Sequence, residues 1–158
     1  MKGGLSWITT LLLGLLVTWC PQARAQNSNA GSTIKVHVHY TGSGTVDEKH
    51  KIYVVLWDSP DFASAGGQVM PAAVLPASSK NATVTFSDVK IVPAYVSTVF
   101  DPKGEWEAQS APPDGSSLGL YSKTPGKPEP IDAKPGKTVE IDLTFDDSVK
   151  MQAGKPSR

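Results

Sequence analysis

The chain contains very little cysteine and arginine. Cys20 is its only cysteine, and Arg24 and Arg158 are its only arginines. If residues 1–25 are removed during export, as argued below, the remaining chain has no thiol. Disulfides, cysteine nucleophiles and thiolate metal sites are then excluded. The bidentate contacts that arginine makes to phosphate or carboxylate groups are reduced to one side chain at the extreme C-terminus.

An excess of charge of one sign is also missing. The chain has 15 Lys and Arg against 15 Asp and Glu, and loss of Lys2 and Arg24 leaves 13 basic side chains. A near-neutral chain that is so poor in arginine argues against nucleic-acid binding and phosphoryl transfer. The serine-elbow, His-Glu-x-x-His and phosphate-loop motifs are absent from the sequence. We therefore predict a protein that is not an enzyme and needs no cofactor.

The N-terminal segment predicts export. Lys2 supplies a positive charge, residues 8–17 form an apolar run too short for a stable membrane anchor, and residues 23–25 read Ala-Arg-Ala. Cleavage after this motif leaves 133 of the 158 residues. The alternatives are an uncleaved helix, or a lipid anchor on Cys20, which follows Trp19 rather than the usual small residue. We predict a secreted or periplasmic protein with no membrane span after cleavage.

Apolar residues at period two predict that the mature chain is all-β. The clearest run is residues 138–145, in which Val, Ile, Leu and Phe alternate with polar residues. Residues 52–57 are apolar on both faces, so we expect a central strand with Trp57 in the core. Further strand patterns occupy residues 34–40, 72–75, 82–86 and 95–100. No amphipathic helical stripe occurs in the mature chain. The pattern predicts one antiparallel β-sandwich, immunoglobulin-like or prealbumin-like, with about seven strands.

The same pattern divides the chain into parts. After the signal peptide, residues 26–32 are small and polar and predict a flexible leader. The sandwich domain is expected at residues 33–146, and residues 147–158 form a polar C-terminal tail that we expect to be frayed. Within the domain, residues 101–132 are rich in Pro, Gly and Ser and predict a long loop. Such loops often carry function, although a tolerated insertion is an equal alternative.

Acidic residues in the long loop are one candidate site. Asp101, Glu105, Glu107 and Asp114 carry carboxylates, which are the ligands that Ca²⁺ prefers. Lys103 lies among them and opposes a cation. The alternative is that the glutamates on either side of Trp106 only form the polar face of a short strand.

Two aromatic residues of this loop are a second candidate. Trp106 and Tyr121 have the amphipathic rings that suit a partly exposed platform for a glycan or a protein. The alternative, which we favour, is that they pin the loop to the sandwich. We take Asp101, Glu105, Trp106 and Tyr121 together as the candidate ligand-binding residues.

A histidine pair is the main metal candidate. His37 and His39 are two residues apart on one predicted strand and therefore share a face, a spacing found in some Zn and Cu sites. The core alternation places this face toward solvent, whereas His50 points inward near a turn. The pair then lacks a third ligand, and two exposed histidines on a polar face are the alternative.

Three segments carry a resemblance to a known family. They are Tyr-Val-Ser-Thr-Val-Phe-Asp-Pro-Lys-Gly at residues 95–104, Ser-Leu-Gly-Leu-Tyr-Ser at 117–122 and Ile-Tyr-Val-Val-Leu-Trp-Asp-Ser at 52–59. Across residues 34–145 the chain resembles secreted bacterial proteins catalogued as domain of unknown function 2141. The resemblance implies a prealbumin-like or immunoglobulin-like sandwich, like the regulatory domains of carboxypeptidases, and no established activity. The family's calcium-loop-like turn, Asp-x-Asn-x-Asn-Gly, is altered at Lys103 and Glu105.

Two functions remain in view. The first is an exported, non-catalytic binding or accessory module for an unknown envelope or extracellular ligand, either a protein or a glycan. The second is an envelope protein that binds Zn or Cu through His37 and His39, or Ca²⁺ through the acidic loop.

Overall fold

The computed structural model describes residues 30–64, 69–108 and 110–152. The predicted signal peptide and residues 26–29 of the predicted leader lie outside the described residues. The strands are β1 (Ser32–Tyr40), β2 (Ile52–Trp57), β3 (Ala73–Ala77), β4 (Asn81–Val89), β5 (Tyr95–Phe100), β6 (Ser117–Leu120) and β7 (Thr138–Phe145), and one short 3₁₀ helix, η1 (Pro60–Ala63), follows β2.

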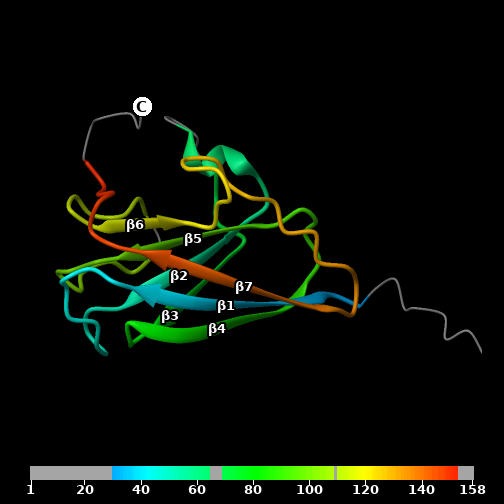
Figure 1. Ribbon diagram of the computed structural model, residues 1–158, viewed down its shortest axis with the longest axis horizontal. Coiled ribbons are helices and arrows are strands. Elements are labelled where there is room, and N and C mark those ends of the chain that lie inside the picture. The colour runs from blue at the N-terminus through cyan, green and yellow to red at the C-terminus, as the bar shows by residue number, and fades with distance from the viewer. Residues whose placement is uncertain (1–29, 65–68, 109, 153–158) are drawn as a thin grey trace, which may run out of the picture.

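The seven strands form two stacked sheets (Figure 1). The three-stranded sheet has the order β4-β1-β7, and the four-stranded sheet has the order β3-β2-β5-β6. This arrangement confirms an all-β, two-layer fold. It also confirms that residues 52–57 form a central strand. No helix in the described part of the chain is long and apolar enough to cross a membrane.

One pair of strands differs from the predicted antiparallel arrangement. β1 and β7 are parallel, in a register that runs from Thr33 opposite Thr138 to Tyr40 opposite Phe145. Parallel neighbours need a long connection, and here almost the whole domain lies between the two strands. Period-two patterning gives the face of each residue but not the direction of its strand, so the sequence could not reveal this pairing.

The core lies between the sheets and follows the predicted alternation. Ile34, Val36 and Val38 of β1 are fully buried, and the register places Val36 beside Val84 of β4 and Ile141 of β7. Opposite them, β2 contributes alternate apolar residues from the four-stranded sheet. The inner faces of both sheets therefore form one continuous hydrophobic core, which is the main favourable term in folding.

The segment expected as a long loop is partly ordered into the sheet. Its residues 117–120 form β6, which pairs antiparallel with β5, and Ile131 pairs with Ala94. Gly119 of β6 packs so closely that a Cβ there would collide with Thr98 and Phe145. A glycine and two leucines, which are not branched at Cβ, give a weak strand signal, and this explains why the pattern did not indicate this strand.

The expected flexible ends are also more ordered than the sequence indicated. Ser32, placed in the leader, is a buried residue of β1. Residues 149–151, placed in a frayed tail, lie along the outer edge of β6. The Leu118 N–H donates to the Val149 carbonyl at 2.9 Å, and the Met151 N–H donates to the Ser116 carbonyl at 2.8 Å. The ordered domain therefore extends at least to residue 152.

Candidate functional site

Asp101 organises the start of the segment that we expected to carry a site. Its side chain is buried, with 1% exposed. Oδ1 accepts a hydrogen bond from the Lys103 N–H at 2.9 Å, and Oδ2 accepts from the Glu105 and Trp106 N–H groups at 2.6 and 2.8 Å. Charge-assisted bonds of this kind are short and strong. Asp101 therefore holds the turn that carries Trp106, and its oxygens are directed at the backbone.

The other acidic residues of the segment are not gathered around a cation site. Glu105 and Glu107 are both exposed, on either side of the buried Trp106 in the chain. No group of three or more His, Cys, Asp or Glu side chains in residues 30–64, 69–108 and 110–152 could hold a metal ion. The described residues therefore do not support the calcium hypothesis.

Trp106 covers the outer face of the four-stranded sheet. It is 8% exposed and packs with Val55 and Val99, two buried residues on that face. Its ring meets Tyr53 edge-on, with centroids 4.9 Å apart and an interplanar angle of 79°, and its Nε1–H donates to the Ser110 carbonyl at 3.0 Å. These contacts pin the loop to the sheet.

Tyr121 lies on the other side of the same sheet. Its side chain packs against the core between the two sheets, while its backbone N–H donates to the Val96 carbonyl at 3.0 Å. Because Trp106 is on the outer face, the two rings are separated by the sheet. The structure does not bring them together as one platform.

The histidine pair lies on the outer face of the three-stranded sheet, as the alternation predicted. The His37 Nδ1 is 3.0 Å from Thr83 Oγ1, and its Nε2 is 3.3 Å from Glu140 Oε2. The His39 Nδ1 is 2.8 Å from Asn81 Oδ1. A shallow, open hollow is lined by the two histidines together with Asn81, Thr83 and Asp142. His37 has both ring nitrogens engaged, so the arrangement does not present two free nitrogens to a metal.

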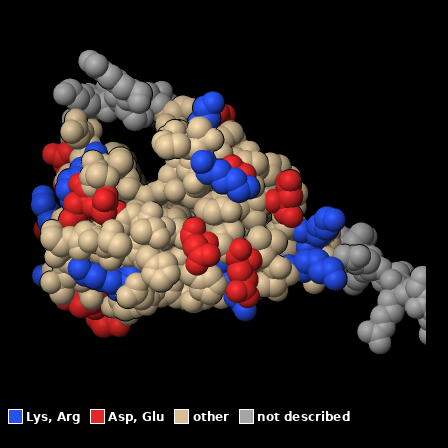
Figure 2. Space-filling model, in the orientation of Figure 1, with Lys and Arg blue, Asp and Glu red and all other residues tan. Residues whose placement is uncertain are grey.

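The surrounding surface is mixed in charge. Figure 2 shows acidic and basic side chains scattered over the side of the molecule formed by the three-stranded sheet, with no broad area of one sign. Lys35 Nζ and Glu140 Oε1 form an ion pair at 3.0 Å on this face. The Lys35 and His37 hydrogen bonds hold the pKa of Glu140 below its ordinary value. Lys35 and Glu140 therefore neutralise each other on this face.

An aromatic row on the opposite face is the feature that the sequence analysis missed. Trp57, expected in the core, is half-buried on the outer face of β2. Alternate residues of a strand point to the same face, so Trp57 lies on the face of Tyr53 and not on the face of Leu56. Its ring stacks on Phe62 of η1 with centroids 4.6 Å apart and an interplanar angle of 3°. Its Nε1–H donates to Ser97 Oγ at 2.9 Å.

Four rings therefore follow the outer face of β2. Trp106 stacks edge-on against Tyr53 at one end, and Phe62 stacks flat against Trp57 at the other. At about 3.3 Å per residue, the Cα atoms of Tyr53 and Trp57 are about 13 Å apart. Burial is the main cause that raises the pKa of the Tyr53 phenol, with smaller contributions from the charges of Asp101 and Glu107. The signal in the sequence was the alternation of Tyr53, Val55 and Trp57 on one face.

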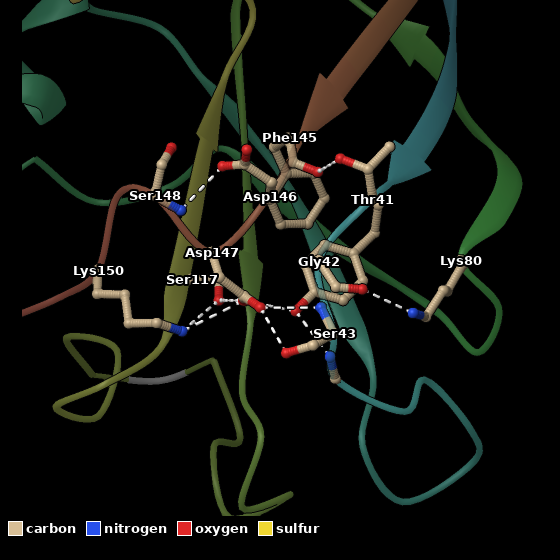
Figure 3. Close-up of polar contacts among 12 residues, drawn as sticks. Thr41, Gly42, Ser43, Lys80, Ser117, Phe145, Asp146, Asp147, Ser148 and Lys150 are labelled. Carbon is tan, nitrogen blue, oxygen red and sulfur yellow. Dashed lines mark hydrogen bonds and ion pairs between the residues drawn. The ribbon is translucent and has the colours of Figure 1, made fainter.

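A second missed feature is a polar cluster around Asp147 (Figure 3). Asp147 Oδ1 accepts from Tyr40 Oη and from Ser117 Oγ, both at 2.6 Å, and Oδ2 accepts from the Ser43 N–H at 2.9 Å. Lys150 Nζ lies 3.2 Å from the same carboxylate. Hydrogen bonds from Ser117 and Tyr40 hold the pKa of Asp147 far below its ordinary value. This cluster fastens the C-terminal segment across the end of the sandwich.

Comparison with known proteins leaves the family open. No protein-family model, no curated protein and no solved structure matches the chain.

Proposed function

We propose that the protein is an exported, non-catalytic binding module whose contact surface is the outer face of its four-stranded sheet. Removal of residues 1–25, as the sequence predicts, would deliver the sandwich to the periplasm or the exterior. This proposal keeps the binding role and the Trp106 expected from the sequence, and it replaces the rest of the long-loop site with residues of β2 and η1. The resemblance to the secreted bacterial family stays a prediction alongside it.

The observation that carries the proposal is the aromatic row itself. In a two-layer sandwich one face of each sheet forms the core and the other normally meets water with polar residues. Here the outer face of the four-stranded sheet instead collects Tyr53, Trp57, Phe62 and Trp106 over Val55 and Val99. Tyrosine and tryptophan on a partly exposed face supply large contact area at low entropy cost, as binding surfaces require.

Exposure is greatest at the end of the row that is formed by Trp57 and Phe62. Both side chains are half-buried, whereas Trp106 at the other end is covered by its own loop. Met70, two residues before Ala72, is 79% exposed, and the Ala72 N–H donates to the Leu56 carbonyl at 2.8 Å. Partly exposed aromatic side chains stacked on an outer sheet face are typical of an interaction surface.

Tryptophan fluorescence gives a direct test. After removal of residues 1–25 the only tryptophans are Trp57 and Trp106, both on the proposed surface. We expect one class within a panel of polysaccharides, peptidoglycan fragments and short peptides to change the emission of the mature protein in a saturable way. We expect Trp57→Ala and Phe62→Ala to weaken that binding about tenfold or more, which corresponds to about 1.4 kcal/mol.

The matched control is Thr85→Ala, which removes an exposed side chain on the outer face of the other sheet. It should bind as the wild type does. If every ligand that binds the wild type also binds Trp57→Ala with unchanged affinity, the surface is not the binding site and the proposal fails.

A further inference from the structure

Two exposed aspartates are neighbours in the sequence of the two stacked rings. Asp58 directly follows Trp57 at the end of β2, and Asp61 directly precedes Phe62 within η1. Both are exposed. Within the described part of the chain, neither carboxylate forms an ion pair or accepts a hydrogen bond. The Asp61 N–H donates to Ser59 Oγ at 3.2 Å.

The strands beside this end of β2 carry no compensating charge. Trp57 pairs with Tyr95 of β5, and Leu56 pairs with Ala73 of β3. Neither β3 nor β5 contains a charged residue, and residues 53–64 contain no Lys, Arg or His. Asp58, in the connection between β2 and η1, and Asp61, in η1, are therefore the only charged residues in residues 52–63, 73–77 and 95–100.

The combination of these features is selective for one type of partner. The faces of aromatic rings attract cations through their quadrupole, by about 0.5 to 2 kcal/mol per contact depending on exposure. Carboxylates at the rim of an interface steer cationic partners toward it and disfavour anionic ones.

We propose that the surface formed by Trp57, Phe62, Asp58 and Asp61 docks a basic segment of another protein. An arginine or lysine of that segment lies against the aromatic pair, with its charge toward the two aspartates. This assignment rests on the proposed function, because it names the partner class for the same surface.

A peptide titration tests the partner class. The probe is a short peptide in which arginine alternates with leucine, titrated into the mature protein while the fluorescence of Trp57 and Trp106 is followed. The comparison probes are the same peptide with glutamate in place of arginine, and a neutral oligosaccharide. We expect saturable binding of the arginine peptide alone. We also expect the affinity for this peptide to fall steeply as the salt concentration rises from about 0.1 M to about 1 M, because the Debye screening length shortens from about 10 Å to about 3 Å.

Matched double variants separate this surface from general attraction between opposite charges. Asp58→Asn with Asp61→Asn should lower the affinity for the arginine peptide about tenfold, since exposed pairs contribute up to about 1 kcal/mol each. Glu48→Gln with Asp142→Asn removes two exposed carboxylates elsewhere and should leave the affinity unchanged. Circular dichroism of both double variants should match the wild type, since all four side chains are exposed.

The outcomes for the two proposals differ. If the neutral oligosaccharide or the glutamate peptide binds in a manner that depends on Trp57, and the aspartate variants have no effect, the cationic partner is refuted while the binding surface stands. Equal weakening of the arginine peptide by both double variants also refutes the cationic site. If no probe of any class shows binding that depends on Trp57, both proposals fail.

Discussion

Tyr40 donates its hydroxyl hydrogen to Asp147 Oδ1 at 2.6 Å, and this bond joins the end of β1 to the segment that follows β7. The Tyr40 ring packs between Phe100 and Phe145, with centroids 4.8 and 4.9 Å away. One residue therefore contributes its ring to the core and its hydroxyl to the closure of the sandwich. The pairing links two parts of the chain that are 107 positions apart.

Replacing Asp147 should destabilise the protein and reduce its acid sensitivity. Asp147→Asn removes the negative charge that hydrogen bonds and an ion pair from four residues stabilise. We expect the free energy of unfolding at pH 7 to fall by about 2 kcal/mol. A carboxylate with a lowered pKa contributes stability above its ordinary pKa of about 4, and that contribution is lost as the pH falls. The difference in free energy of unfolding between the wild type and Asp147→Asn, measured by urea denaturation, should therefore become smaller as the pH is lowered from 7 to about 2.

The neighbouring carboxylate is the control for this prediction. Asp146 bonds only to Ser148 among the contacts described, and it is exposed. Asp146→Asn should change the stability at pH 7 much less than Asp147→Asn does. A wild-type protein whose advantage over Asp147→Asn grew as the pH fell would contradict the role given to this carboxylate.

Gly119 should tolerate no side chain. A Cβ there would collide with Thr98 Oγ1 and with Phe145, so we expect Gly119→Ala to lower the free energy of unfolding by about 1 to 3 kcal/mol through overpacking. The Thr98 hydroxyl is buried without a hydrogen-bond partner among the described residues. Thr98→Ala removes one of the two colliding groups, so the double variant should recover part of the loss. Purely additive effects in the double-mutant cycle would show that the two residues do not interact.

The strands that could be predicted from the sequence are those with a strong local alternation of apolar and polar residues. Residues 138–145 alternate without exception, and the structure gives them as β7 with Ile141, Leu143 and Phe145 buried. β6 was missed because Gly119 and its leucine neighbours give little strand signal. The parallel pairing of β1 with β7 is a relation between distant segments, and local patterning holds no information about it.

The candidate site was harder to predict from the sequence than the fold was. Trp57 was assigned to the core because a run that is apolar on both faces normally lies between two covered faces. The outer cover turned out to be Trp106 and Phe62, which the chain supplies from a loop and a 3₁₀ helix. Asp147 was missed because its partners come from β1, β6 and a turn, and a polar tail gives no sign of such contacts.

Asp101 should control the position of Trp106. Asp101→Ala leaves the N–H groups of Lys103, Glu105 and Trp106 without their acceptor, and we expect a loss of about 2 to 3 kcal/mol. The loop should then loosen, so the Trp106 emission should shift to longer wavelength and be quenched more strongly by acrylamide. The control is Glu107→Gln, which changes an exposed carboxylate of the same loop. An unchanged spectrum in folded Asp101→Ala would contradict this role.

Zinc and copper should not stabilise the protein through its histidine pair. Both nitrogens of His37 and the Nδ1 of His39 are already within hydrogen-bond distance of side chains, and no third ligand completes a metal group within the described residues. A ligand that binds the folded state raises the melting temperature in proportion to the logarithm of its concentration over Kd. We therefore expect equimolar Zn²⁺ or Cu²⁺ to leave the melting temperature unchanged, in wild type and in His39→Ala alike. A rise that appears in the wild type and disappears in His39→Ala would restore the metal-binding hypothesis, because only a site that includes this imidazole would produce that difference.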